Sequence, residues 1–288
     1  MERLSRRRVL WGGAMLAGGI APRAASAQES GGLLAELRKA RVVKVGIANQ
    51  PPFSSLNADG TMTGIAPTIA QKVMERLGVP KMEGVVATYG ELIPGMLAGR
   101  WHFVAASLTI TRERCAQVRF CDPLSFEGSC IVSLPDKNQL KPKTMKELIQ
   151  GNVTVGVPTG GAQYRQLLAA GIAPDNIRQF NQDTAMFDGL IAGRVQYLWA
   201  SHLPAVEISR RRRINFDIVF PVSDAAAPGA ANAFRLQDQE LYDAYQKELR
   251  ALKASGEYLT IANQFGFEIP PELMNATADQ QCSAVSRA

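Results

Sequence analysis

Histidine and cysteine are scarce in this sequence, which holds two histidines and four cysteines among 288 residues. The cysteines include no C-x-x-C pair and have no flanking histidines, so a zinc site is not expected. The sequence also lacks a G-x-S-x-G elbow, an H-E-x-x-H helix and a phosphate-loop motif, on which several large enzyme classes depend. These absences argue against an enzyme, and we expect neither a metal nor a cofactor.

Long apolar runs are also few, and the one near the N-terminus has the features of an export signal. Arginines at residues 6–8 precede an apolar stretch of 13 residues (9–21), and an A-x-A cleavage site follows at residues 25–27. A membrane span needs about 20 apolar residues. We therefore expect residues 1–27 to be a twin-arginine signal peptide, cleaved on export to the periplasm, and not an anchor. No later segment is apolar enough to predict a span.

Without this leader, neither sign of charge dominates. The leader holds five arginines and one glutamate, so the other residues carry 27 basic and 25 acidic side chains, a net charge of +2. The basic balance of the whole chain therefore gives little support to nucleic-acid binding. The remaining length suffices for one large domain or two modest ones.

The four cysteines leave the disulfide question open. Cys115, Cys121, Cys130 and Cys282 allow three complete pairings, between which the sequence does not choose. A bridge is compatible with an oxidising compartment. We expect either one bridge among the first three cysteines or buried thiols.

An internal similarity predicts the architecture. Residues 92–107 read LIPGMLAGRWHFVAAS and residues 186–201 read MFDGLIAGRVQYLWAS, with six identities at a constant offset of 94. Each copy joins an apolar helical segment to a strand-like run through a glycine, which suits the left-handed end of a helix. VVKVGIA at residues 42–48 likewise resembles NVTVGVP at residues 152–158. Two echoes in the same order favour two lobes of similar α/β construction; chance αβ patterning is the alternative explanation.

Local patterns predict strands in alternation with helices. Strands are expected at residues 42–48, 85–88, 103–108, 153–157 and 197–200. Helices are expected at residues 66–77, 91–98, 113–117, 145–150, 163–170, 185–192, 203–211, 238–255 and 257–265. This alternation predicts an α/β fold whose lobes are mostly parallel sheets flanked by helices, with a ligand site at the strand C-termini.

Two breaks in the pattern predict the lobe boundaries. Leu134-Pro135-Asp136 and Phe220-Pro221-Val222 are interpreted as two crossover hinges. We therefore expect residues 41–133 and 222–270 to form lobe one, and residues 136–219 to form an inserted lobe two. A ligand would lie in the cleft and be buried by hinge closure. The polar tail, residues 271–288, is expected to be flexible.

The segment from Ser107 to Arg114 is the strongest candidate for ligand chemistry. It follows a predicted strand and opens a predicted helix, where backbone N–H groups attract anions. The Thr109 hydroxyl could donate in the same direction, and either Arg112 or Arg114 could clamp a carboxylate. The alternative is an ordinary solvent-facing first turn of a helix.

Three runs of this sequence resemble a known family. GIAPTIAQKVMERLG at residues 64–78 and YGELIPGMLAGRWHFVAASLTITRERC at residues 89–115 resemble the first lobe of the polar amino-acid class of ABC-importer solute-binding proteins. GEYLTIANQFGF at residues 256–267 resembles the closing helix of that class. YGELIPGMLAGR and ITRERC are similar in particular to the ectoine/hydroxyectoine-binding branch. The resemblance implies a two-lobed periplasmic-binding-protein fold and an exported, monomeric protein that delivers a small solute to a membrane permease.

By position, the resemblance implies that Arg114 grips a ligand carboxylate, with Thr109 and the backbone near Ser107 beside it. Phe53 and Tyr89 match aromatic residues that line the pocket, where a cationic group can lie on the ring faces. Two positions depart from the ectoine branch. Gln50 stands where that branch has a glutamate that pairs with the positive ring, and Thr109 stands where it has a third aromatic residue. Both departures count against ectoine itself.

The second lobe departs further from the amino-acid binders. Gly161 and Ala162 stand where these proteins have hydroxyl side chains, while backbone N–H groups remain available. The aspartate that captures the α-ammonium falls, by position, at Ser201. A buried ammonium without that carboxylate would lack its charge partner. We therefore expect a small carboxylate without a primary ammonium, such as an ectoine-like, betaine-like or modified amino acid.

An enzyme on the same fold, similar to periplasmic dehydratases of cyclohexadienyl acids, is the main alternative. It would need an ionisable group at the cleft, and none of the mapped positions is Asp, Glu or Lys, while Arg114 does not serve as a base near neutral pH. His102 is expected to be structural, and His202 remains a candidate at the cleft rim. Arg210–Arg213 could contact an acidic permease surface, although a solvated helix end is the simpler explanation.

Overall fold

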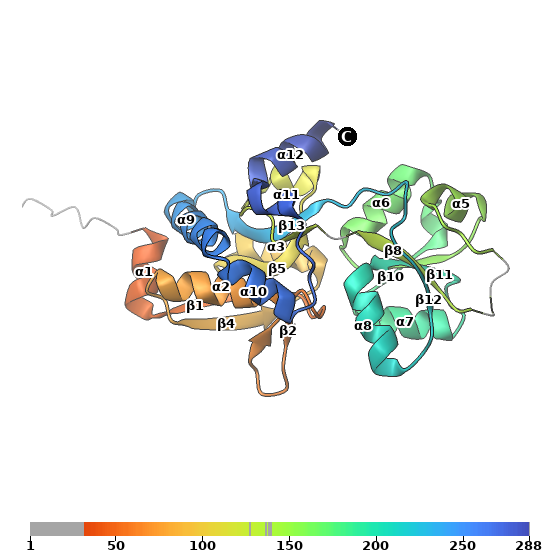
Figure 1. Ribbon diagram of the computed structural model, residues 1–288, viewed down its shortest axis with the longest axis horizontal. Helices are drawn as coiled ribbons and strands as arrows, with labels where there is room; N and C mark the ends of the chain where they lie inside the picture. The colour runs from red at the N-terminus through yellow and green to blue at the C-terminus, as the bar shows by residue number, and fades with distance from the viewer. Residues whose placement is uncertain (1–31, 127, 136, 138–139, 288) are drawn as a thin grey trace, which may run out of the picture. The chain divides into compact units, whose positions relative to one another are not determined.

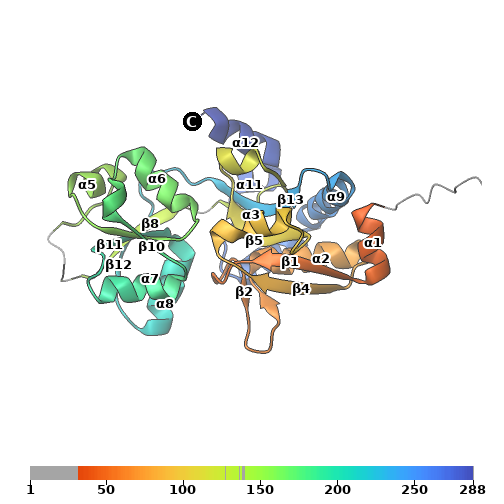
Figure 2. The same cartoon turned by 180° about the vertical axis from the view of Figure 1, so that it is seen from behind.

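Two β-sheets organise the described part of the chain. The computed structural model describes residues 32–126, 128–135, 137 and 140–287, so the predicted signal peptide lies outside the described residues. The first sheet has the strand order β4-β1-β5-β13-β6, with β7 paired to β13. The second sheet has the order β10-β9-β11-β8-β12, and β2 pairs with β3 in a small hairpin. Figures 1 and 2 show each large sheet with helices packed around it.

The first sheet is built from both ends of the chain. Its strands are β1 (Val42–Ile47), β4 (Lys81–Val86), β5 (Phe103–Thr109), β6 (Val118–Phe120), β7 (Ser125–Phe126) and β13 (Gly229–Arg235), and the nearby hairpin is β2 (Ser55–Leu56) with β3 (Met62–Thr63). Its helices are α1 (Leu33–Ala40), α2 (Ile65–Arg76), α3 (Tyr89–Leu97), α4 (Arg112–Cys115), α9 (Gln239–Ser255) and α10 (Glu257–Gln264). Along α2, the side chains of Ile65, Ile69, Val73 and Leu77 are buried in the core of this lobe. Apolar side chains at helical spacing are buried there because they share one helix face.

The second sheet is built from one continuous segment. Its strands are β8 (Ser129–Ser133), β9 (Val155–Pro158), β10 (Ile177–Phe180), β11 (Tyr197–Ser201) and β12 (Asp217–Val219). Its helices are α5 (Met145–Gln150), α6 (Ala162–Ala170), α7 (Asp183–Ile191) and α8 (His202–Arg212), with a short 3-10 turn at Pro174–Asn176. Apolar side chains from β9 and β11, among them Val155, Val157, Tyr197 and Trp199, bury themselves against α5 and α6. This core is separate from the core of the first sheet, so the predicted two-lobed α/β fold is confirmed.

The sheets are mixed where mostly parallel sheets were predicted. β1 pairs in parallel with β4 and β5, and β9 pairs in parallel with β10 and β11. The strands next to the crossovers run the other way: β13 is antiparallel to β5, and β8 is antiparallel to β11. β8 and β13 are the strands that follow the two crossovers. Each of them runs antiparallel to the repeat strand beside it, so the sheets are mixed.

The internal repeat corresponds to equivalent elements. The two copies are α3 with β5 and α7 with β11, while the second echo is β1 and β9, each next to the repeat strand of its sheet. Gly99 and Gly193, the glycines after the two helices, have φ of 73° and 70°. Both positions therefore need the left-handed backbone that favours glycine.

Strand pairing moves the first crossover. The prediction ended the first segment of lobe one at residue 133, yet β8 (Ser129–Ser133) pairs with β11 and β12 of the second sheet. The pattern break at Pro135 follows β8 and so marks the end of a strand, not a change of lobe. We therefore place the first crossover between β7 and β8, and the second at residues 220–228, between β12 and β13.

The C-terminal segment corrects two expectations. Residues expected to be a flexible tail form α11 (Pro271–Asn275) and α12 (Ala278–Arg287). The disulfide joins Cys115 to Cys282, so the expected bridge among the first three cysteines is wrong. Cys121 and Cys130 are buried as thiols. The bridge ties α12 to α4, which holds an otherwise polar segment against lobe one.

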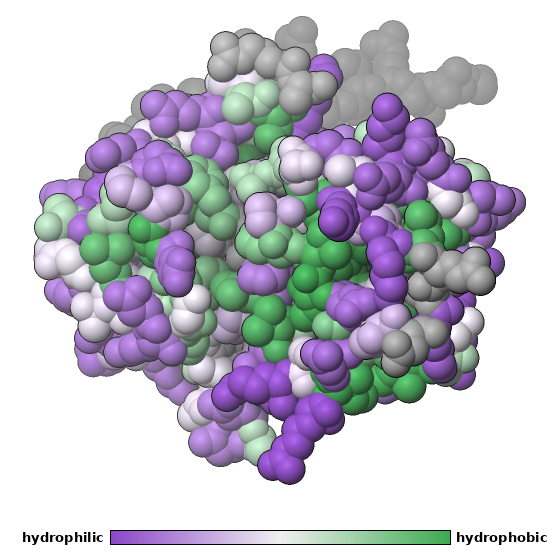
Figure 3. Space-filling model, turned by 45° about the vertical axis from the view of Figure 1, so that its right-hand side comes forward, coloured by the Kyte–Doolittle hydropathy of each residue, from purple (hydrophilic) through white to green (hydrophobic). Residues whose placement is uncertain are grey.

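The helices of the described chain are too short or too polar to cross a membrane. On the face in Figure 3, apolar side chains gather toward the middle and polar side chains surround them.

Candidate functional site

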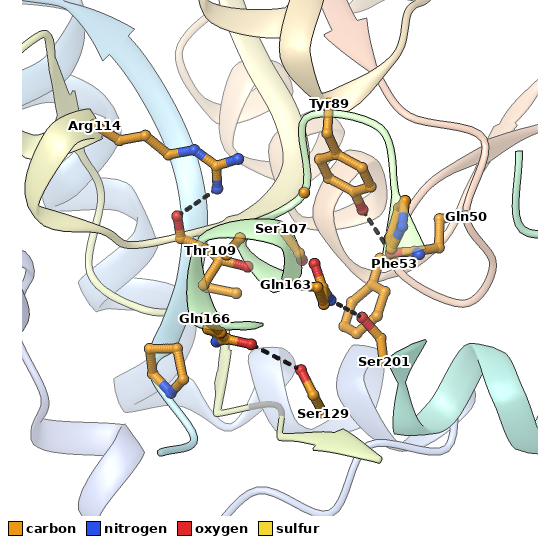
Figure 4. Close-up of a pocket in the computed structure, with 15 residues that line it drawn as sticks. Gln50, Phe53, Tyr89, Ser107, Thr109, Arg114, Ser129, Gln163, Gln166 and Ser201 are labelled. Atoms are coloured by element: carbon orange, nitrogen blue, oxygen red, sulfur yellow. Dashed lines mark hydrogen bonds between the residues drawn. The ribbon is translucent and has the colours of Figure 1, made fainter. Parts of the chain in front are cut away.

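One cavity is lined by residues from both lobes (Figure 4). It contains all nine residues predicted from the sequence: Gln50, Phe53, Tyr89, Ser107, Thr109, Arg114, Gly161, Ala162 and Ser201. It is also lined by Ser129, Pro158, Gln163, Gln166, Pro228 and Ala230. The structure thus brings the predicted residues together from the turn after β1, α3, β5 and α4 on one side, and from the start of α6 and the end of β11 on the other.

Arg114 reaches this cavity from the short helix α4. The Thr111 hydroxyl accepts the backbone N–H of Arg114, which holds the turn, and the exposed Arg112 lies outside the cavity. The Arg114 guanidinium donates from Nη1 to the Thr109 carbonyl at 2.8 Å and from Nη2 to the Gly160 carbonyl at 3.0 Å. Burial lowers the pKa of Arg114 to about 10. Among the described residues no carboxylate lies within 4.0 Å of this guanidinium, so this partly buried charge has no ion pair.

Polar groups near Arg114 are also left without partners. The Ser107 hydroxyl is buried and makes no hydrogen bond to any described residue. Ser107 has φ of 46°, a left-handed backbone that costs energy in a residue other than glycine. Across the cavity α6 begins at Ala162, and the first N–H groups of a helix have no partners within it. A hydroxyl and helix N–H groups thus face the same space as the guanidinium.

An aromatic wall stands away from Arg114. Phe53 is 3% exposed and lies in a turn that two backbone hydrogen bonds close. In this turn the Gln50 N–H donates to the Ser54 carbonyl, and the Phe53 N–H donates to the Gln50 carbonyl. Tyr89 is the first residue of α3, whose start is capped because the Glu91 carboxylate accepts the Thr88 backbone N–H at 2.9 Å. Both rings therefore reach the cavity from well-defined turns.

Tyr89 begins a chain of hydrogen bonds that crosses between lobes. The Tyr89 hydroxyl donates to Oε1 of Gln50 at 2.7 Å, and Nε2 of Gln50 donates to Oδ2 of Asp183 at 2.8 Å. Asp183 is the first residue of α7 in lobe two. Burial raises the pKa of Asp183 to about 6, although the hydrogen bond from Gln50 opposes this. Together with the bond from Arg114 to Gly160, this contact joins the two walls of the cavity.

The wall from lobe two is mostly neutral and polar. Nε2 of Gln163 donates to the Ser201 hydroxyl at 3.2 Å. Oε1 of Gln166 accepts from Nε1 of Trp199 at 2.8 Å and from the Ser129 hydroxyl at 3.4 Å. These bonds fix the amides on α6 against β8 and β11, so they supply oriented dipoles without net charge.

The comparisons with known proteins agree with this architecture. Residues 43–268 match the family described as bacterial extracellular solute-binding proteins, family 3. This chain belongs to that family. A curated relative, the probable amino-acid ABC transporter periplasmic-binding protein y4tE of Sinorhizobium fredii, is 27% identical over 266 residues, which cover 88% of this chain and 86% of the relative.

Two solved structures have folds similar to that of this solute-binding protein. EhuB in complex with hydroxyectoine is 31% identical and has a TM-score of 0.82, covering 88% of this chain and 98% of EhuB. The ancestral amino acid-binding protein AncCDT-1, a precursor of cyclohexadienyl dehydratase, is 24% identical with a TM-score of 0.71, covering 82% of this chain and 99% of that one. The second likeness shows the fold alone.

Several lining residues of this solute-binding protein were missed from the sequence. Ser129 and Ala230 lie on or beside β8 and β13, which were not predicted as strands. Gln166 lies one helical turn after Gln163, a spacing that could have indicated it. Asp183 was also missed, although it follows Tyr89 by the same offset of 94 that relates the two repeat copies. The repeat pairs a tyrosine with this aspartate, and an aspartate at the start of a helix is ordinary, so the sequence carried no signal for it.

Other candidates prove to be placed elsewhere. His202 stacks on Phe220 with ring centroids 3.8 Å apart and lines a different cavity. His102 accepts the Lys44 backbone N–H at 3.0 Å through Nδ1, the structural role that was predicted. Glu207 pairs with Arg210 and Arg211, and Asp188 pairs with Arg212, so two carboxylates of the same lobe offset about half of the charge of this arginine run.

Proposed function

We propose that this solute-binding protein captures a small carboxylate solute in the periplasm and delivers it to the permease of an ABC importer. The signal at residues 1–27 would direct its export by the twin-arginine route, and it would act as a monomer. The family match and the curated importer relative support the transport role. The cleft between the lobes would close on the solute by hinge motion at the two crossovers.

The observation that carries the proposal is the unpaired guanidinium of Arg114. A buried charge without a partner costs several kcal/mol. Arg114 donates only to two neutral carbonyls, and its pKa is lowered by that burial. A solute carboxylate would supply the missing charge and accept further hydrogen bonds from Arg114 and the Ser107 hydroxyl. An anion is therefore the ligand group that this end of the cavity favours.

The rest of the cavity suggests the shape of the solute. Phe53 and Tyr89 present rings on which a methylated or ring-shaped cationic group can lie. Ser201, Gln163 and Gln166 present neutral groups, so no carboxylate of the lining meets a primary ammonium. Ectoine-like, betaine-like and modified amino-acid solutes fit this arrangement, and the likeness to EhuB, solved with hydroxyectoine, supports the choice.

The dehydratase-like alternative gains no support from the cavity. The described residues that line it include no aspartate, glutamate, lysine or histidine. Proton transfer in such a reaction needs a group that gains and loses a proton near neutral pH. The arrangement is suited to binding.

The proposal is tested by removing the guanidinium. In Arg114→Ala, affinity for carboxylate solutes should fall by about 2–5 kcal/mol, because the solute loses its charge partner. Ligands are first found with a thermal-shift panel of ectoines, betaines, proline derivatives and amino acids, since a ligand stabilises the form that it binds. Titration calorimetry then compares wild type with the variant.

Arg112→Ala is the matched control, because Arg112 lies on the same short helix but is exposed. It should leave the affinity unchanged. Equal affinity of wild type and Arg114→Ala for every carboxylate in the panel would contradict the proposal.

A further inference from the structure

Asp183 is a second charge without an ion pair, and it is partly buried. Its carboxylate accepts from Nε2 of Gln50 at 2.8 Å, and among the described residues no lysine, arginine or histidine nitrogen lies within 4.0 Å of it. Gln50 is 5% exposed and lines the solute cavity, so a single amide group separates Asp183 from that space. Asp183 itself lines the neighbouring space on the other side of Gln50 and Tyr89.

The charge of Asp183 fixes the direction of each hydrogen bond in the wall. An ionised carboxylate only accepts, so Gln50 must turn its NH₂ toward Asp183 and its Oε1 toward Tyr89. The Tyr89 hydroxyl then donates its proton to Gln50. The lone pairs of the Tyr89 oxygen and the faces of the Tyr89 and Phe53 rings are left for the solute. This wall therefore offers electron-rich surface and negative potential.

The cavity thus lies between two unpaired charges of opposite sign. Arg114 stands at one end, and Asp183 stands behind Gln50 and Tyr89 at the other. Burial raises the pKa of Tyr89 most. The negative charge of Asp183 raises this pKa further and the positive charge of Arg114 lowers it, so Tyr89 interacts with both charges. A solute with a negative and a positive end would compensate both charges, whereas a simple anion would compensate only one.

We propose that Asp183 selects dipolar solutes, whose carboxylate meets Arg114 and whose cationic group lies against Phe53 and Tyr89, where Asp183 acts on it through Gln50. The cation is a delocalised or methylated one without a primary ammonium. Asp183 is thus a specificity-determining residue that does not touch the solute. This inference rests on the proposed function, because it takes the Arg114 end as the carboxylate site.

The test compares solutes of equal shape with and without positive charge. Glycine betaine is matched by tert-butylacetate, in which carbon replaces the charged nitrogen, and ectoine is matched by a methylcyclohexene carboxylate. Each is titrated into wild type, Asp183→Asn and Asp188→Asn. The asparagine at 183 keeps the size and an acceptor for Gln50, so only the charge is lost. Asp188 is the control, since it lies on the same helix but pairs with Arg212.

In at least one of these solute pairs, wild type should bind the positively charged solute more tightly than the neutral solute of the same shape. Asp183→Asn should weaken binding of that charged member by about tenfold or more, which corresponds to about 1.4 kcal/mol. Its neutral match should change by less than about twofold, and Asp188→Asn should change neither.

The other outcomes overturn the inference in distinguishable ways. An equal loss for both members of a pair would mean that Asp183 only helps the lobes to close. The charge of Asp183 would have no effect on binding if Asp183→Asn weakened neither solute of a pair. The same conclusion would follow if wild type bound the neutral solutes more tightly than the charged ones. In all of these cases carboxylate capture by Arg114 stands. If wild type binds no carboxylate at all, the inference and the proposed function both fail.

Discussion

At the scale of single residues, partial burial of the charges of Arg114 and Asp183 costs the protein free energy of folding. Each carries a charge that burial disfavours, and neither finds an ion pair among the described residues. Structural ion pairs would have compensated such charges within the fold. The uncompensated charges are therefore better explained by binding than by stability.

The two residues differ in how far the sequence revealed them. Arg114 could be predicted because it lies in a run that resembles a family motif, although spacing alone did not separate it from Arg112. Asp183 could not be predicted from its neighbours, because an aspartate at the start of a helix is ordinary. Its role depends on Gln50, which lies 133 residues away in sequence. Only the fold brings the two together.

Binding of dipolar solutes should weaken in mild acid. Burial raises the pKa of Asp183 to about 6, and a bound cation favours the ionised form and so lowers that pKa. Affinity should therefore fall by about tenfold between pH 7 and pH 5, as Asp183 takes up a proton in the unliganded protein. Calorimetry over this range should show the fall for glycine betaine or ectoine, while tert-butylacetate should show only the smaller loss that protonation of its own carboxylate causes.

The neighbouring charged groups do not share this titration. Thr88 lowers the pKa of Glu91 through hydrogen bonds. At Glu207, burial is outweighed by hydrogen bonds from Arg211 and Arg210, so its pKa is lowered as well. Tyr89 stays protonated because burial raises its pKa, and Arg114 stays charged because its pKa, although lowered by burial, is about 10. A pH profile that remains steep in Asp183→Asn would contradict the assignment.

At the scale of elements, helix α4 depends on its attachment to α12. It has four residues and none of them is buried, so packing alone holds it weakly. The Cys115–Cys282 bridge joins it to α12 across 167 residues of sequence. The N-terminus of α12 is held as well, because Asp122 accepts the Ala278 N–H at 3.2 Å. The C-terminal helices thus stabilise the segment that carries Arg114.

Loss of the bridge should lower stability. Cys282→Ser should reduce the free energy of unfolding by about 2–4 kcal/mol, because the bridge restricts the unfolded chain over a long loop. Chemical denaturation of the two proteins measures the difference. A thiol reductant should lower the stability of wild type to that of the variant and leave the variant unaffected. Equal stability of the oxidised wild type and Cys282→Ser would contradict this account.

Elements were predicted well where side chains are periodic and poorly where they are small. The expected helix at residues 145–150 matches α5, and the repeat helices and strands differ from α3, β5, α7 and β11 by a few residues. β13 was missed because its sequence, GAANAFR, lacks the β-branched residues typical of strands. It is a strand nonetheless, since β5 and β6 pair with it on either side. Tertiary contacts decided what local preference did not.

At the scale of the whole molecule, two glycines from different lobes lie close together. Gly160 has φ of 70°, and a Cβ added there would lie 2.2 Å from the backbone nitrogen of Gly90 in the other lobe. The Gly160 carbonyl also accepts from Arg114 at 3.0 Å. The contact therefore needs a residue without a side chain, in a backbone conformation that glycine adopts readily.

Gly160→Ala should oppose closure. The methyl group would push against Gly90 only when the lobes meet, so affinity should fall by about tenfold, or about 1.4 kcal/mol, beyond the cost of the left-handed backbone. Gly193→Ala is the control, since it has the same φ of 70° and no atom within 4 Å of the added Cβ. Small-angle scattering with saturating solute should show that Gly160→Ala stays more extended than the control. Equal affinity and equal scattering in the two variants would argue against this contact.

The division of the cavity between lobes gives solute capture an order. Arg114, Phe53 and Tyr89 belong to lobe one, so a solute that diffuses to the separated lobes can settle there before lobe two takes part. In the proposed closure, Asp183 and the Gly160 carbonyl, which belong to lobe two, reach the cavity only as the lobes meet. We therefore expect lobe one to govern how fast a solute is taken up and lobe two to govern how long it is retained.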